Sequence, residues 1–167
     1  MVTKSYLFKT LNRLDRLYND PTADDQKTSS YSKLALIELC GWIEETMDDI
    51  VLRCATRCLQ SPANLKLIDK TVHNTYSFEY EAFRKMLMMV IGLATLEKIE
   101  EKLEKTGKIS ALKGDLGNLK TSRNRAAHTH TKGTLTTYDA PSKTKYNFER
   151  IYAWLTELDA ELQRHNC

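Results

Sequence analysis

Long runs of this sequence contain no residue that would end a helix. Six glycines and three prolines occur among 167 residues, which leaves few positions for the turns that many short strands require. Between these breaks, apolar residues recur every three or four positions, as Leu34, Ile37 and Cys40 do, and this is the period of a helix with one buried face. The sequence therefore predicts an all-α bundle, and its length suits a single domain over residues 1–167.

The apolar pattern and its breaks divide the chain into six expected helices. Pro62 suits a first helical position, Thr106-Gly107 suits a helix end, and Ser110 suits the N-cap of the following helix. A long basic loop over 129–146 is expected before the last helix. The expected helices cover residues 4–18, 30–60, 63–72, 80–105, 111–128 and 147–164.

Composition favours a cytoplasmic protein that does not enter a membrane. The N-terminus leads into a polar helix without the apolar segment of a secretory signal. The most apolar run, Met86 to Leu96, has 11 residues and is shorter than the ~20 that span a bilayer, so we expect a buried core helix. Zinc would require two more ligands at a spacing that matches Cys54 and Cys58, so we expect no metal and no cofactor. Reduced thiols in or near the core are expected for the four cysteines, Cys40, Cys54, Cys58 and Cys167.

Basic residues are concentrated in one part of the chain, although the net charge is only +3. Residues 102–150 carry 11 Lys and Arg against 4 Asp and Glu, whereas the remainder carries 14 against 18. A phosphate-binding surface requires such an excess, although a solvated helix face can also produce it. Tyr138 and Tyr146 are candidates for stacking on bases. The side chains expected to contact RNA are Lys120, Arg125, His130, Lys132, Lys143 and Lys145.

One arginine interrupts the apolar pattern of the fifth helix. The pattern predicts a hydrophobic residue at position 123, but the sequence has Arg123. Burying an unpaired guanidinium costs several kcal/mol, and arginine does not escape by losing its proton. We therefore expect Arg123 to meet an ion-pair partner, a ligand or another chain. The apolar positions that define the pattern are Leu112, Leu116, Leu119 and Ala126.

The residues that follow Arg123 add the groups that RNA cleavage needs. Asn124 and His128 are four apart and share a helix face, whereas Arg123 and His128 are separated by about 140° around a regular helix. Arg123 and His128 would converge if the helix frays, or if two copies face each other across a two-fold axis. A histidine can move a proton near neutral pH, and an arginine can stabilise charge on a phosphate. The alternative is a surface cap or salt bridge at a helix end.

Residues 123–128 read Arg-Asn-Arg-Ala-Ala-His, which resembles the hallmark of the HEPN superfamily. In that superfamily Arg, a polar residue (often Asn), three further residues and His lie near the end of a late helix. The long loop and the closing amphipathic helix make the layout similar to the RiboL-PSP type of HEPN domain. The resemblance implies a bundle of five to six helices and a homodimeric, metal-independent endoribonuclease with a composite active site.

The resemblance also assigns roles and a biological setting. Arg123 and His128 would be catalytic and Asn124 supportive, and such proteins act in toxin–antitoxin, abortive-infection or other anti-phage systems, with an antitoxin or regulatory partner. Toxins paired with a nucleotidyltransferase antitoxin usually carry Tyr two residues after the His, where this chain has His130. Two alternatives are a non-catalytic HEPN module that dimerises and binds nucleotide, RNA or protein, and a helical-bundle interaction protein in which the motif is a coincidence.

Overall fold

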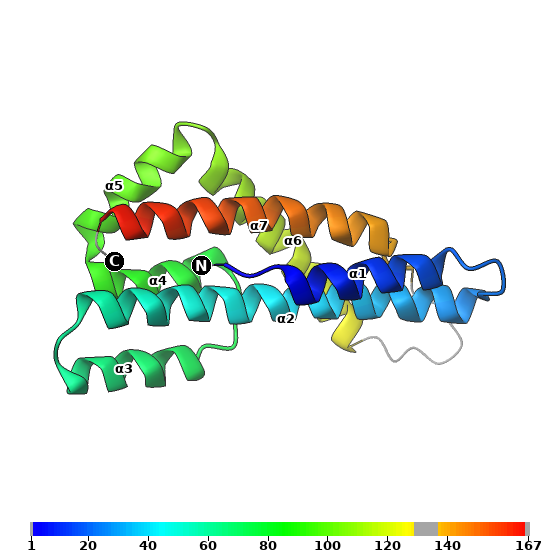
Figure 1. Ribbon diagram of the computed structural model, residues 1–167, viewed down its shortest axis with the longest axis horizontal. Helices are drawn as coiled ribbons and strands as arrows, with labels where there is room; N and C mark the ends of the chain where they lie inside the picture. Colours follow the sequence, from blue (N-terminus) through cyan, green and yellow to red (C-terminus); the bar gives the residue numbers. More distant parts are fainter. Residues whose placement is uncertain (1, 129–136, 166–167) are drawn as a thin grey trace.

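A computed structural model describes residues 2–128 and 137–165 of the chain. These residues form seven α-helices and no strand (Figure 1). The prediction of an all-α helical bundle is confirmed, with one helix more than expected. No helix in the described ranges combines the length and apolarity needed to cross a bilayer. The helices are α1 (Ser5–Tyr18), α2 (Asp25–Cys58), α3 (Pro62–His73), α4 (Tyr80–Ile91), α5 (Leu93–Glu104), α6 (Lys108–His128) and α7 (Pro141–Arg164).

The long helix α2 forms the axis of the bundle. α1 packs along its N-terminal half, and α7 runs beside both helices in the same direction as α2 (Figure 1). Phe148 of α7 is fully buried, and Trp42 of α2 meets its ring edge-on with the ring centroids 4.9 Å apart. Trp42 also donates a hydrogen bond from Nε1 to the carbonyl of Thr3, at 2.9 Å. Trp42 thus links the start of the chain, by a hydrogen bond, to the two longest described helices, by aromatic packing.

The single helix predicted over 80–105 is wrong, because Gly92 divides it into α4 and α5. Gly92 has φ +75°, a left-handed backbone that residues with a side chain rarely adopt. Arg84 of α4 joins the two helices by donating hydrogen bonds of 2.7 and 2.9 Å to the carboxylate of Glu100 in α5. The expectation that the apolar run forms one buried core helix is also wrong, since its exposed members include Met88, Met89 and Leu93.

Two helices begin earlier than predicted because their first residues suit a helix start. α2 begins at Asp25, since the carboxylate of Asp24 accepts a hydrogen bond of 2.8 Å from the N–H of Lys27. α7 begins at Pro141, whose fixed φ suits a first helical position and whose missing N–H is not needed there. The last helix therefore starts six residues before its predicted start, and residues 141–146 of the predicted loop are helical.

The start of α6 also differs from the prediction. Gly107 has φ +69° and ends the turn after α5, as expected. α6 then begins at Lys108, so Ser110 lies inside the helix and is not its N-cap. The N–H of Ser110 donates a hydrogen bond of 2.9 Å to the carboxylate of Glu104. This bond holds the first turn of α6 against the end of α5.

The exposed side of α2 includes residues that the apolar pattern placed in the core. Leu34 and Ile37 are 44% and 37% exposed, whereas Leu36 and Ile43 are buried. The buried arc of α2 is shifted because α1 and α7 cover one side of the helix and α4 and α6 cover another. Leu34, Ile37 and the exposed Gly41 are three and four residues apart, so they form one solvent-facing strip, called the α2 strip below.

Candidate functional site

α6 carries the predicted motif on its last turns and ends at His128. Arg123 lies on the line of the buried face and is half-buried. The guanidinium therefore interrupts the apolar contact between α6 and the centre of the bundle, at the position where the sequence pattern placed it. The buried face of α6 consists otherwise of apolar side chains that are at most 6% exposed: Leu112, Leu116, Leu119 and Ala126.

Arg123 reaches the side of α2 that carries Cys40. Burial raises the pKa of the Cys40 thiol to about 12, while the nearby positive charge of Arg123 opposes that rise and the negative charge of Glu44 adds to it. Arg123 forms no hydrogen bond or ion pair with the rest of the described chain. A half-buried guanidinium without a carboxylate partner is unfavourable for folding, so this position favours an anionic ligand or a second chain as its partner.

Asn124 and Lys120 lie on the flank of α6 that faces the start of α4. Lys120 pairs with Glu79, the residue before α4, at 2.5 Å, and this hydrogen bond lowers the pKa of Glu79. Asn124 is half-buried one turn later. Because α6 stays helical as far as His128, the backbone positions of Arg123 and His128 stay about 140° apart around the helix. The side chain of His128 lies outside the described part of the chain.

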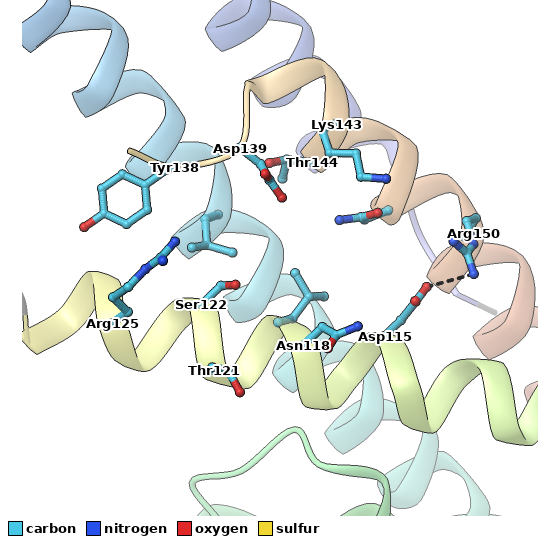
Figure 2. Close-up of a pocket in the computed structure, with 13 residues that line it drawn as sticks. Asp115, Asn118, Thr121, Ser122, Arg125, Tyr138, Asp139, Lys143, Thr144 and Arg150 are labelled. Carbon is cyan, nitrogen blue, oxygen red and sulfur yellow. Dashed lines mark ion pairs between the residues drawn. The ribbon is translucent and has the colours of Figure 1, made fainter. Parts of the chain in front are cut away.

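A cleft of about 580 Å³ lies on the opposite flank of α6, between α6 and the first turns of α7. Figure 2 shows α6 along one side, α7 along the other and α2 behind them. This volume is within the roughly 300–1,000 Å³ typical of small-molecule sites. The polar and charged residues that line the cleft and are discussed below are Asp115, Asn118, Ser122 and Arg125 from α6, Tyr138 and Asp139 before α7, and Lys143, Thr144, Asn147 and Arg150 from α7.

Arg125 is the motif residue that reaches this cleft. Its guanidinium lies over the Tyr138 ring, 5.8 Å from the ring centroid, and Nη2 donates a hydrogen bond of 3.4 Å to the carbonyl of Thr137. The two side chains face each other at one end of the cleft (Figure 2). Arg125 therefore fixes the chain that enters α7 and also places positive charge at the rim of the cleft.

The other end of the cleft is closed by an ion pair. Arg150 Nη2 lies 3.3 Å from Asp115 Oδ2, and that oxygen is buried without a hydrogen bond to any described residue. Lys143 stands at the α7 rim, with its Nζ 4.9 Å from the centroid of the Tyr146 ring. Tyr146 is 51% exposed, so this cation and ring remain accessible to a ligand.

The remaining basic residues predicted to contact RNA are dispersed. Lys145 points from α7 toward α1, where its Nζ donates a hydrogen bond of 2.6 Å to Oδ1 of Asn12. His130 and Lys132 lie outside the described residues. The structure thus brings Arg125 and Lys143 to one cleft, whereas Lys120 and Lys145 lie on other faces of α6 and α7.

The sequence analysis did not identify the uncharged polar residues of the cleft. Asn118, Ser122 and Asn147 form no side-chain hydrogen bond within the described ranges. Thr144 is only 3% exposed, and its hydroxyl is also without such a bond to the described residues. The three- and four-residue spacing of Asn118, Ser122 and Arg125 was visible in the sequence, but only the position of α7 shows that this face borders a cleft.

Comparisons of the chain with protein-family models, with curated proteins and with solved structures give no match. The comparisons therefore give no support to the resemblance that residues 123–128 suggested. Any function assigned to this chain has to rest on its own residues and their geometry.

Proposed function

We propose that this chain is a metal-independent, HEPN-type endoribonuclease that acts on cellular RNA as a cytoplasmic homodimer. The observation that carries the proposal is Arg123, a half-buried guanidinium on the apolar face of α6 that has no ion pair with any described residue. It lies five positions before His128 in the last turns of the same helix. Toxin–antitoxin, abortive-infection or anti-phage defence, with an antitoxin or regulatory partner, is the setting that the motif suggests.

The proposed chemistry uses the RNA's own 2′-hydroxyl as the nucleophile. His128 of one protomer accepts the 2′-OH proton as the oxygen attacks the adjacent phosphorus, and the resulting imidazolium gives a proton to the 5′-oxygen as the P–O5′ bond breaks. Arg123 stabilises the negative charge on the phosphate oxygens, and Asn124 orients the imidazole or the phosphate. The products are a 2′,3′-cyclic phosphate and a 5′-hydroxyl.

A second copy of the chain is needed because one helix does not bring Arg123 and His128 together. α6 is helical through His128. This favours a site in which Arg123 and His128 meet across a two-fold axis, and not one in which the end of the helix frays. The α2 strip provides the apolar surface for such contact. Ile37 of the strip precedes Cys40 by one helical turn, so it neighbours the side of α2 that Arg123 reaches. Pairing of two such surfaces would bring both motifs to the dimer axis.

The first test compares cleavage of a mixed cellular RNA pool, with excess chelator, by the wild type and by His128→Ala. We expect the variant to lose at least about 100-fold in rate, because general acid–base catalysis contributes roughly 10²–10⁴-fold. The matched control is His73→Ala, since His73 is 69% exposed on α3 and should cleave at the wild-type rate. Equal cleavage by His128→Ala and wild type would falsify the assignment.

A mixing experiment tests whether the site is shared between protomers. Arg123→Ala and His128→Ala are each expected to be inactive, yet their heterodimer would hold one Arg123 and one His128 from different chains. Mixing them should therefore restore part of the activity if the site forms across the dimer axis. A site built within one protomer gives no recovery, because neither chain then holds both groups. Size-exclusion chromatography with light scattering, on Ile37→Asp and the wild type, checks that the α2 strip carries the dimer.

The second candidate is a non-catalytic HEPN module that binds RNA, a nucleotide or a protein partner. The polar groups that line the cleft favour it, since they could bind a ligand whether or not the RNA is cut. In that case the protein binds RNA with an affinity that falls steeply as salt is added, but does not cut it. A helical-bundle interaction protein with a coincidental motif shows neither cleavage nor salt-dependent RNA binding.

A further inference from the structure

We infer that the cleft between α6 and α7 receives one unpaired guanine of the RNA beside the cleaved phosphate. The inference rests on the proposed ribonuclease function and assigns the base that this site selects. The cleft begins at Arg125, two residues after Arg123 and about 3 Å further along the helix axis. Arg123 and Arg125 point about 160° apart around α6, so the RNA strand has to cross α6 between the phosphate held at Arg123 and the base held in the cleft.

The first argument is that the cleft contains polar groups without partners. Polar side chains inside folded proteins are normally hydrogen-bonded, yet the half-buried Ser122 and Asn147 line the cleft with no bond to any described residue. The exposed Asn118 lines it as well. Thr144 is only 3% exposed, and its hydroxyl has no hydrogen-bond partner in the described chain. A few convergent polar groups in a preformed cavity are the usual composition of a small-ligand site.

The second argument concerns charge and excludes a phosphate from the interior. The positive charge of Arg150 is taken up by Asp115, 3.3 Å away. The exposed Asp139 carboxylate also lines the cleft and would repel a phosphate near it, and Arg125 and Lys143 are the exposed cations of the same lining. The arrangement fits a neutral base inside the cleft and backbone phosphates outside it.

The third argument identifies the base. An ionised carboxylate can only accept hydrogen bonds, so Asp139 requires a ligand with donors, and guanine has two adjacent donors at N1 and N2. Lysine is a suitable donor to guanine O6 and N7, which is the role available to Lys143. Figure 2 shows Asp139 and Lys143 on the α7 side of the cleft, opposite Asn118 on α6. Adenine offers no pair of adjacent donors to the carboxylate.

The wall of the cleft suits the face of a base as well as its edge. Tyr138 and Arg125 contribute a ring and a planar guanidinium that lie close to each other, with the guanidinium 5.8 Å from the ring centroid. Unpaired RNA bases are commonly held on aromatic rings and on arginine planes. The edge of the base would then meet Asp139, and its face would meet this wall.

The test measures binding of short RNAs to the His128→Ala protein, which is expected not to cut them. Fluorescently labelled pentanucleotides with a central guanine or a central adenine are compared by anisotropy at fixed salt. We expect the guanine RNA to bind about tenfold more tightly, because one good bidentate contact to a base gives roughly tenfold or greater discrimination. Adding Asp139→Asn should remove this preference. The matched control is Glu149→Gln, which neutralises an exposed carboxylate on α7 and should keep the preference.

Equal binding of the two RNAs, or a preference that survives Asp139→Asn, would overturn the inference. Mapping the cleavage sites of the wild type separates this failure from failure of the ribonuclease proposal. Cleavage without a guanine beside the cut sites means that the enzyme stands and the guanine pocket is wrong. Selective binding of the guanine RNA without any cleavage by wild type means that the pocket stands and the ribonuclease is wrong. Neither binding nor cleavage overturns both.

Discussion

Replacing Arg123 with leucine should make the protein more stable while removing its activity. Arg123 lies on a line of buried apolar residues on α6 and is half-buried without an ion pair to the described chain. A leucine at this position continues the apolar contact with α2 and leaves no guanidinium to desolvate. Violations of the apolar pattern are retained where function requires them. The Arg123 guanidinium should therefore both lower the stability of the fold and provide the activity.

The size of the effect follows from the burial of the position. Full burial of a leucine side chain contributes about 1.5–3 kcal/mol, and a half-buried position should yield roughly half of this. We therefore expect Arg123→Leu to raise the free energy of unfolding by about 1 kcal/mol. For a domain of this size that gain corresponds to a Tm increase of roughly 2–4 °C.

The assay is thermal unfolding followed by circular dichroism, at one protein concentration because a dimer's Tm depends on concentration. Arg57→Leu is the matched control, since Arg57 is exposed on α2 and its replacement should raise neither the Tm nor the free energy of unfolding. RNA cleavage is measured on the same samples and should be lost only in Arg123→Leu. A lower Tm for Arg123→Leu would show that the guanidinium supports the fold, and retained cleavage would remove Arg123 from the site.

Three further predictions concern the fold. Asp159 is 3% exposed and accepts hydrogen bonds of 3.0 and 3.1 Å from Arg53, which also pairs with Asp49. Asp159→Ala should lower the free energy of unfolding in urea by about 2 kcal/mol, because charged hydrogen bonds are lost while Arg53 keeps Asp49. A loss below half of that would show that the pair is solvated. Gly92→Ala should lower the free energy of unfolding by about 1 kcal/mol, because φ at this position is +75°. An added Cβ meets no atom within 4 Å, so the cost comes from the backbone and not from a clash. An unchanged Tm would show that the backbone at Gly92 relaxes without cost. Burial and then the charge of Glu44 raise the pKa of Asp48 to about 6 from 3.8, so its ionisation destabilises the folded state as pH rises through that interval. Asp48→Asn should therefore be more stable than wild type at pH 8 but not at pH 3.5, and a difference that does not change with pH would contradict the assignment.

The sequence was sufficient for features that depend on a strong period or on one residue's backbone preference. The helical class follows from the apolar period, and the half-buried position of Arg123 follows from its place in that period. Pro62 starts α3 as expected, and Gly107 ends the turn after α5 with φ +69°. These features are decided within one or two helical turns, which is the distance over which a sequence pattern is informative.

The features that were not predicted depend on neighbours that are distant in the sequence. Gly92 stands in an apolar run that reads as one helix, and the outward turn of α5 is fixed by the Arg84–Glu100 hydrogen bonds. Leu34 and Ile37 have the spacing of core residues, but no described helix covers that side of α2. The cleft was missed because its polar groups come from α6 and α7, and asparagine and serine on a helix surface resemble solvated residues.

The geometry of α6 explains why recognition and proton transfer would be divided between two chains. Consecutive helical residues point about 100° apart, so Arg123 faces α2, Asn124 the side of α4 and Arg125 the cleft beside α7. One protomer can hold the phosphate on one side of α6 and a base of the same strand on the other, but a helix that stays regular keeps its own His128 turned away from Arg123. A second protomer can supply the imidazole without bending either helix. An isolated protomer would then bind RNA without cutting it, and a partner that covers the α2 strip would silence the enzyme while leaving the cleft open.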